Sequence, residues 1–191
     1  KGSFGLIFDN NLEPEIYNFR ILELFVEAAE KLGIYDYPVH IKIDSGMHRL
    51  GFEAGDIDKL IQKLQQQQQV KIRSVFTHLA GADEARFDTF TRQQIETFSK
   101  CADQLSSVFQ HKIFRHVLNS SGIERFPEYQ FDMVRLGIGH YGISALNGVN
   151  LKQVCSLKTI ILQIKNVRAG DTVGYSRKGI VNRDMRIAVL P

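Results

Sequence analysis

Apolar residues in the first 150 positions alternate between two spacings, and this alternation constrains the fold more than any other feature. A spacing of two, typical of a β-strand, occurs at residues 15–17, 39–43, 70–76, 112–118 and 131–134. A helical spacing separates the first four of these segments, at residues 19–32, 57–66 and 87–108. Strands that alternate with helices of this length form a parallel sheet covered by helices. The sequence therefore predicts an α/β fold.

The pattern changes after about residue 150. Three β-type segments follow without intervening helices, at residues 157–167, 173–175 and 186–190, and a Gly-Asp turn stands at residues 170–171. Such a series is typical of an antiparallel β domain. We therefore expect two domains, an α/β domain over residues 1–150 and the beginning of a β domain over residues 151–191.

Local signals predict where some elements begin and end. Gly33 is expected to end the helix over residues 19–32, and Asp56 is expected to cap the helix that starts at residue 57. The glutamine run at residues 65–69 is expected to be a solvated helix end or loop.

Composition excludes several classes of protein. The chain has 191 residues, of which 43% are apolar and 24% charged, as in ordinary globular proteins. Its apolar stretches are far shorter than the roughly 20 residues that cross a bilayer. Its first ten residues lack the apolar centre of a signal peptide. We therefore expect a cytoplasmic protein without a membrane segment.

Charge and cysteine content limit the partners. The net charge is +3 and the pI is about 8.9, but lysine and arginine are scattered, so no nucleic-acid partner is expected. A mild positive charge does suit an anionic cofactor. Cys101 and Cys155 lack the spacing of a zinc site and are expected to be reduced structural residues, and no metal site is expected.

Polar residues follow the ends of four expected strands. In a barrel of parallel strands and helices the chemistry lies at the carboxyl ends of the strands, so these residues are expected to converge. They are Lys42 with Arg49, His78, Asn119 with Ser120, and Arg135 with Gly137.

The last two of these groups have the chemistry of a phosphate site. Ser120 offers a hydroxyl, and Gly122, Gly137 and Gly139 let backbone N–H groups come close to an anion. The alternative is that the NSSG and GIG segments are ordinary turns, and the residues alone leave that alternative open.

Residues 40–52, HIKIDSGMHRLGF, resemble a block of the alanine racemases, a family of enzymes that use pyridoxal phosphate (PLP). Further blocks follow in the same order: THLAGADE at residues 77–84, LNSSGI at 118–123 and FDMVRLGIGHYG at 131–142. The resemblance covers nearly the whole chain. It implies a partial (β/α)8 TIM-type barrel followed by the start of a β-rich C-terminal domain. It also implies interconversion of L-alanine and D-alanine for peptidoglycan synthesis.

The resemblance assigns two residues to the ring of the cofactor. Arg135 would donate a hydrogen bond to the pyridine nitrogen. Because a guanidinium effectively never loses its proton, this bond would keep the nitrogen unprotonated and weaken the ring as an electron sink. The implied consequence is fast return of the substrate proton with little transamination. His78 would pack against the ring, and the alternative is a strand-end histidine bonded to the backbone.

Other residues would hold the phosphate and the substrate. Ser120, Gly137 and Ile138 would bind the phosphate, with Asn119 supporting that corner. At the other end, Arg49 would contact the cofactor's phenolic oxygen and the substrate carboxylate.

Two further positions carry alternatives. Lys42 would be carbamylated and orient Arg49; unmodified, it would repel Arg49, and it could also be an ordinary exposed lysine. Asp83 would lie at the mouth of the substrate corridor or cap a helix.

Racemisation by two bases needs a proton acceptor on each face of the reacting carbon. The family supplies them from a lysine in a K-A-x-A-Y-G motif, which holds the cofactor, and from a partner-subunit tyrosine in a G-Y-A-D-G motif. Neither motif occurs here, and His48 and Leu136 replace a small residue and a proline of many relatives. We therefore expect an interior piece of a homodimeric racemase, inactive by itself. Residues 131–142 further suggest a parent fused to another cell-wall enzyme.

Three other interpretations stay open. A racemase or decarboxylase for another amino acid would keep the cofactor, although decarboxylases favour a carboxylate at the pyridine nitrogen, where this chain has Arg135. A non-catalytic PLP-binding module would keep the fold without the reaction. An unrelated phosphate-binding barrel enzyme would keep only the anion site.

Overall fold

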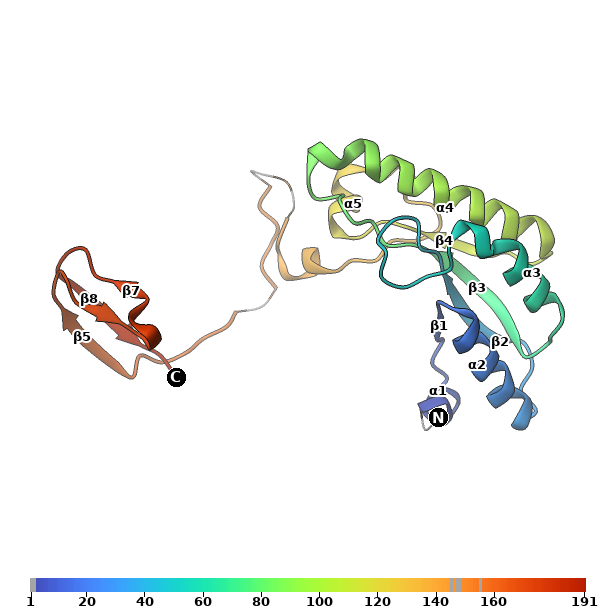
Figure 1. Ribbon diagram of the computed structural model, residues 1–191, viewed down its shortest axis with the longest axis horizontal. Coiled ribbons are helices and arrows are strands. Elements are labelled where there is room, and N and C mark those ends of the chain that lie inside the picture. Colours follow the sequence, from blue (N-terminus) through green and yellow to red (C-terminus); the bar gives the residue numbers. More distant parts are fainter. Residues whose placement is uncertain (1–2, 145, 147–148, 155) are drawn as a thin grey trace. The chain divides into compact units, whose positions relative to one another are not determined.

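The computed structural model describes residues 3–144, 146, 149–154 and 156–191. The chain divides into two units, Lys1–Gln153 and Val154–Pro191. The first unit contains a four-stranded parallel sheet in the order β1-β2-β3-β4, and helices α2, α3 and α4 lie along it (Figure 1). The predicted α/β arrangement is confirmed. Its elements are α1 (Ser3–Asp9), β1 (Glu15–Ile16), α2 (Phe19–Lys31), β2 (Tyr37–Lys42), α3 (Ile57–Gln65), β3 (Val70–Phe76), α4 (Asp88–Val108), β4 (Phe114–His116) and α5 (Ser120–Arg125), with short 3-10 turns at Ala54–Asp56, Ala85–Phe87, Pro127–Tyr129 and Ile138–Tyr141.

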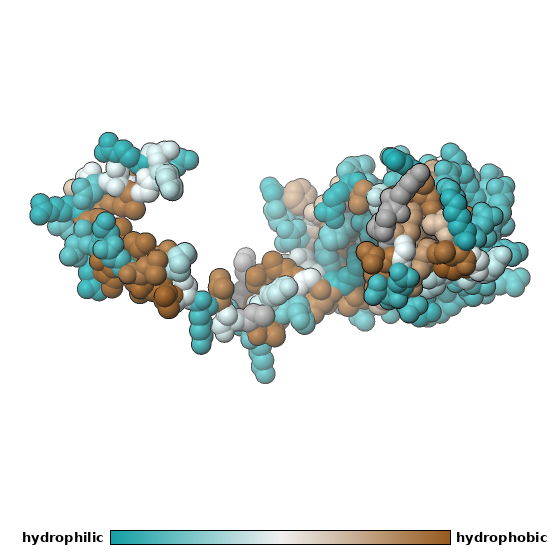
Figure 2. Space-filling view, turned by 90° about the horizontal axis from the view of Figure 1, so that it is seen from below, coloured by the Kyte–Doolittle hydropathy of each residue, from teal (hydrophilic) through white to brown (hydrophobic). Residues whose placement is uncertain are grey.

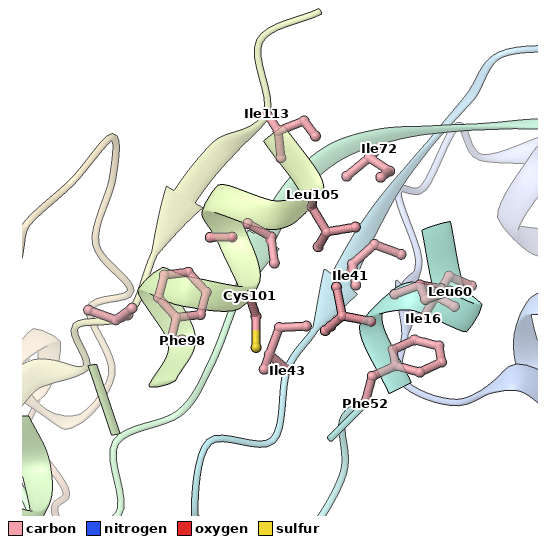
Figure 3. Close-up of a cluster of buried hydrophobic side chains, with 14 of the residues drawn as sticks. Ile16, Ile41, Ile43, Phe52, Leu60, Ile72, Phe98, Cys101, Leu105 and Ile113 are labelled. Carbon is pink, nitrogen blue, oxygen red and sulfur yellow. The ribbon is translucent and has the colours of Figure 1, made fainter. Parts of the chain in front are cut away.

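The helices form because each carries an apolar stripe that the sheet buries. In α2, the Asn18 side chain caps the helix by accepting the Ile21 N–H at 2.8 Å, and the apolar stripe includes the fully buried Phe25. Strand β2 contributes Val39 and Ile41 to the same core, each with 0% exposure. Figure 3 shows how side chains of the sheet and helices meet. Full burial of an aliphatic or aromatic side chain contributes about 1.5–3 kcal/mol, so this layer holds the sheet to its helices.

The opposite face of the sheet is polar. The register aligns His40 of β2 with Ser74 of β3, and Lys42 with Phe76 and then with His116 of β4. A register shift between Val39 and His40 turns Ser74 toward the same face as His40. The inner face of an ordinary barrel carries bulky apolar residues, so this polar face marks the part of the sheet that positions chemistry.

Two predicted helix-end features differ in detail. Asp56 does not cap α3, because its carboxylate accepts the Glu53 N–H at 3.1 Å inside a 3-10 turn that precedes the helix. Within the glutamine run, Gln67 is more than a solvated residue: its amide donates to the Leu64 and Val70 carbonyls and accepts the Val70 N–H. Gln67 thereby joins the end of α3 to the start of β3.

The strand predicted over residues 131–134 does not form. Phe131 starts the segment in the left-handed region, at φ 50°. The Asp132 N–H donates to the Arg115 carbonyl, but the Asp132 carboxylate takes the Arg115 N–H that a ladder would use. A side chain therefore replaces part of the backbone pairing, and the segment runs beside β4 as an irregular chain. Strand β4 itself is shorter than the predicted residues 112–118.

The second unit contains two antiparallel pairs, in agreement with an antiparallel β segment. They are β5 (Gln163–Val167) with β8 (Met185–Val189) and β6 (Thr172–Val173) with β7 (Gly179–Ile180). A 3-10 turn at Tyr175–Arg177 lies between β6 and β7. Residues 157–162 were predicted as strand but are not, because the pairing of β5 begins at Gln163 opposite Val189.

Apolar side chains of the second unit lie at its surface, as Figure 2 shows. Ile164 and Ile180 are exposed by 53% and 73%, and among the described residues of this unit only Val181 is a buried apolar residue. The unit therefore has strand pairing without a hydrophobic core of its own.

Candidate active site

A pocket of about 340 Å³ lies past the carboxyl ends of β3 and β4. This volume is in the range of small-molecule sites. All six residues that the sequence assigned to a cofactor are among its lining residues, which are His78, Asn119, Ser120, Ser121, Arg135, Leu136, Gly137 and Ile138. The structure thus brings together residues that are up to 60 positions apart in the sequence, from His78 to Ile138.

The guanidinium of Arg135 is held by neutral acceptors. Its Nη1 contacts Nδ1 and the carbonyl of His116 at 2.6 and 3.0 Å, and its Nη2 donates to the Thr77 and Val117 carbonyls at 2.5 and 3.4 Å. The ring of Phe76 lies 5.0 Å below the guanidinium carbon. No carboxylate pairs with this cation among the described residues, and its Nε–H has no partner there. Burial lowers the pKa of Arg135 to about 10, so the group stays charged at neutral pH.

His116 is a site residue that no sequence motif indicated. It is buried at the end of β4, and its ring stacks on Phe76 with centroids 4.9 Å apart. Burial and the charge of Arg135 lower the pKa of His116 to about 3, so the imidazole is neutral. What could have identified His116 is its register: it pairs with Phe76, which pairs with Lys42, so it lies on the polar face. Only a correct strand alignment reveals that position.

His78 lies on a loop that a buried glutamine holds. The Gln94 amide donates to the His78 carbonyl at 3.3 Å and accepts the Ala80 N–H at 3.0 Å, and Gln94 is 1% exposed. Burial, assisted by the positive charges of Arg135 and Arg49, lowers the pKa of His78. A neutral, half-buried ring is suited to packing against a flat ligand.

Backbone donors gather at the other end of the pocket. The Ser120 hydroxyl accepts the N–H groups of Gly137 and Gly139 at 2.9 and 3.0 Å, and Ser120 is 6% exposed. Asn119 caps α5 by accepting the Gly122 N–H at 2.9 Å, and donates to the Leu79 carbonyl. The two N–H groups converge on the Ser120 oxygen, and a hydroxyl that accepts twice can still donate its own proton to an anion in the pocket.

The loop over residues 44–51 is fixed by its first residue. The Asp44 carboxylate accepts the N–H groups of Gly46 and His48, each at 3.0 Å. Burial opposes ionisation of Asp44, but these backbone hydrogen bonds outweigh it and lower the Asp44 pKa. Gly51, at φ +139°, closes the loop so tightly that a Cβ there would lie 2.4 Å from the Asp44 nitrogen.

Arg49, Lys42 and Asp83 lie outside the lining of the pocket. Arg49 is exposed and forms no hydrogen bond or ion pair with any other described residue. Lys42 is buried, so the alternative of an ordinary exposed lysine is wrong; its ammonium pairs with Glu15 at 3.0 Å. Asp83 is exposed and caps none of the described helices, so the capping alternative is wrong as well.

Other features of the described residues add little to the site. They contain no group of three or more histidine, cysteine, aspartate or glutamate side chains that could hold a metal ion. No helix among them combines the length and the apolar character needed to span a membrane. Cys101 is a free thiol whose burial raises its pKa, and Cys155 lies outside the described residues.

Comparison with known families gives two matches in chain order. Residues 1–145 match the family described as "Alanine racemase, N-terminal domain", and residues 154–191 match "Alanine racemase, C-terminal domain". The chain is 34% identical to alanine racemase of Helicobacter pylori (strain Shi470) over 197 aligned residues, which cover 97% of this chain and 52% of that protein.

Solved structures agree. Alanine racemase of Clostridium difficile 630 has a TM-score of 0.76 at 28% identity, over 99% of this chain and 50% of that one. Alanine racemase of Bartonella henselae, solved with covalently bound pyridoxal phosphate, has a TM-score of 0.76 at 24% identity over 99% of this chain and 51% of that one, a likeness that concerns the fold.

These matches confirm the predicted architecture, part of a TIM-type barrel followed by the start of a β-rich C-terminal domain. The chain spans about half the length of the relatives it matches. Because the N-terminal domain of the alanine racemases matches residues 1–145 and their C-terminal domain matches residues 154–191, this chain belongs to the alanine racemase family.

Proposed function

We propose that the intact protein containing this chain is a PLP-dependent alanine racemase that interconverts L-alanine and D-alanine. One observation carries the proposal: a charged Arg135, held by neutral acceptors, shares a pocket with a corner of anion-binding donors. An arginine at a pyridine nitrogen also argues against the decarboxylase alternative, which favours a carboxylate there.

The pocket fits PLP at both ends. The Ser120 hydroxyl and the backbone N–H groups of Gly137 and Ile138 would hold the phosphate, with Asn119 fixing the start of α5. The Gly137 N–H donates to the Ser120 hydroxyl here and would turn to the phosphate when the cofactor binds. The Nε–H of Arg135, which has no partner in the described part of the chain, would face the pyridine nitrogen. The neutral His78 ring would pack against the cofactor ring. When bound, PLP supplies an electron sink for loss of the substrate α-proton.

The surrounding residues would orient the substrate. The exposed Arg49 guanidinium, unpaired among the described residues, offers two parallel donors to a carboxylate, the geometry that best binds an amino acid's α-carboxylate. The loop over residues 44–51 would hold Arg49 in place, because the Gly46 and His48 N–H groups of this loop donate to the Asp44 carboxylate. Asp83 would lie at the mouth of the corridor through which the substrate enters.

Lys42 is our candidate for carbamylation. Unmodified, it pairs with Glu15, so a carbamate anion at this position would require the Glu15 carboxylate to turn away. We expect the carbamate to accept a hydrogen bond from Arg49. A carbonyl signal from 13C-labelled bicarbonate in the intact protein, absent in Lys42→Arg, would support the modification, and identical spectra would exclude it.

The proposal extends to the location, the oligomeric state and the domains of the intact protein. We propose a cytoplasmic homodimer that supplies D-alanine for peptidoglycan, with the barrel domain over residues 1–150 and the β domain beginning at residue 151. Residues 1–191 alone would be inactive, because neither proton-transfer motif occurs in them. A fusion of the parent to another cell-wall enzyme remains part of this proposal.

The test is a PLP titration of the intact protein followed by an assay for D-alanine by chiral chromatography. We expect a PLP-specific absorbance band and D-alanine formation. Ser120→Ala should weaken PLP binding about tenfold, because it removes a hydroxyl from the phosphate corner. Arg20→Gln, which replaces an exposed arginine outside the lining of the pocket, should change neither PLP binding nor D-alanine formation. Absence of the band would overturn the proposal.

A further inference from the structure

A continuous series of hydrogen bonds crosses the polar face of the sheet from Arg135 to Glu13. After the 2.6 Å contact between Arg135 Nη1 and His116 Nδ1, His116 Nε2 lies 2.9 Å from the Ser74 hydroxyl. The same hydroxyl lies 2.6 Å from His40 Nδ1, and His40 Nε2 lies 2.9 Å from the Glu13 carboxylate. We call these five residues the relay. Each of β4, β3 and β2 contributes one member, and Glu13 precedes β1.

With a neutral His40, the chemistry of the two ends fixes the direction of every bond. Arginine only donates, so His116 Nδ1 accepts and the ring proton of His116 sits on Nε2. That proton goes to Ser74 Oγ, and the single hydroxyl proton of Ser74 goes to His40 Nδ1. His40 then donates from Nε2 to the Glu13 carboxylate, which only accepts. All donors therefore face the same way, and aligned hydrogen bonds polarise one another.

Packing alone does not account for the relay. Ser74 is 0% and His116 4% exposed, and polar groups at such depth cost stability unless every one is bonded. Apolar side chains at these inner-face positions would pack a barrel at least as well. What the polar residues add is a single orientation and tautomer for the imidazole that contacts Arg135.

We propose that Ser74, His40 and Glu13 are positioning residues that act through His116 on Arg135. The relay holds the His116 ring with Nδ1 toward the guanidinium, and this ring holds the guanidinium against the pocket. The consequence for catalysis rests on the proposed function, because there Arg135 contacts the cofactor. The mechanical coupling from Glu13 to His116 does not depend on it.

Glu13 is the best position for the test, because its side chain is 38% exposed and can be changed without opening the core. Glu13→Ala removes the terminal acceptor, and Glu13→Gln keeps an acceptor without the charge. Glu23→Ala is the matched control, since Glu23 is an exposed glutamate that pairs with Lys63 at 2.7 Å on another surface. The readout is the ring 15N shift of His116 in the intact, cofactor-free protein labelled on histidine, assigned with His116→Gln.

We expect Glu13→Ala to move the His116 ring shifts although the two side chains do not touch. Glu13→Gln should move them less, and Glu23→Ala should leave them in place. Ser74→Ala breaks the relay, so in that background Glu13→Ala should cause no further change at His116. In the PLP-loaded protein, Ser74→Ala and Glu13→Ala should each lower kcat about tenfold, with little change in KM for alanine because Arg49 is untouched.

Two results would overturn the inference: unmoved His116 shifts in Glu13→Ala, or effects of Glu13→Ala and Ser74→Ala that simply add. A wild-type protein without racemase activity would overturn the proposed function instead. The His116 shifts of the cofactor-free protein would still decide the coupling.

Discussion

Nη1 of Arg135 lies 2.6 Å from Nδ1 of His116, and only a neutral imidazole can accept this hydrogen bond. Burial and the neighbouring guanidinium lower the His116 pKa to about 3, so the imidazole remains neutral across the working range of pH. The pair therefore keeps one full positive charge, on Arg135, beside the pocket. That charge is available to a ligand because no carboxylate of the described residues pairs with it.

The low pKa of His116 predicts a specific loss of stability in acid. Its usual value is 6.5, so between pH 6.5 and about 3 the unfolded chain binds a proton here that the folded protein does not. The free energy of unfolding should therefore fall as pH falls, by at most about 1.4 kcal/mol per pH unit from this site. Urea unfolding at pH 5 and pH 7 should show a smaller difference for His116→Gln than for the wild type. Equal differences would contradict the assignment.

Gly51 should be intolerant of any side chain. Alanine there would place Cβ 2.4 Å from the Asp44 nitrogen and 2.7 Å from the Ile43 carbonyl carbon, both of which are backbone atoms. We expect Gly51→Ala to lower the free energy of unfolding by more than about 2 kcal/mol. Gly55→Ala is the control, because nothing lies within 4 Å of a Cβ there, and it should change stability by less than about 1 kcal/mol. Equal effects of the two substitutions in thermal unfolding would refute this description of the loop.

Gln94 should control the position of His78. Gln94→Ala removes both hydrogen bonds to the loop, and we expect it to cost about 1–3 kcal/mol and to weaken PLP binding. Gln93→Ala, one residue earlier on the exposed side of α4, should do neither. PLP titrations and unfolding curves for the pair provide the check, and unchanged PLP affinity in Gln94→Ala would show that the loop does not need this clamp.

Glu15 should matter more than other paired glutamates. The Lys42 side chain is 10% exposed, so Glu15→Gln would leave a buried cation without its counter-ion and cost about 1–2 kcal/mol. Glu23→Gln breaks a similar contact to the more exposed Lys63 and should cost less stability than Glu15→Gln, because solvent screens that pair. Chemical denaturation of both variants tests the contrast. If Lys42 is carbamylated in the protein used, Glu15→Gln should instead be neutral or stabilising, a result that the 13C experiment would distinguish.

Much of the first unit could be predicted from sequence because its signals are local. Strand β3 spans the predicted residues 70–76, where apolar residues alternate beneath helices on one face. The strand prediction for residues 131–134 was wrong because the Asp132 carboxylate accepts the Arg115 N–H. The spacing of apolar residues gives no sign of such a hydrogen bond. The strand prediction for residues 157–162 was wrong because a strand needs a pairing partner, and the pairing of β8 with β5 extends only as far as Gln163.

The residues of the site likewise divide into those that the sequence could predict and those that it could not. His78, Asn119 and Ser120 could be placed in one pocket because each follows a strand end, where a parallel sheet brings such positions together. Arg135, Gly137 and Ile138 reach the same pocket although the strand expected before them does not form, and they were assigned through the resemblance. His116 and Gln94 were missed because each resembles an ordinary member of its strand or helix. Their importance comes from contacts 19 and 16 residues away, with Arg135 and His78.

The most direct measurement is proton exchange at the α-carbon of alanine. The intact protein, loaded with PLP, would be incubated with L-alanine in heavy water, and the products would be separated by chirality and analysed by mass spectrometry. We expect D-alanine that carries deuterium at the α-carbon, formed in the wild type and strongly reduced when Arg135 is replaced by glutamine. Unexchanged L-alanine after prolonged incubation would contradict it.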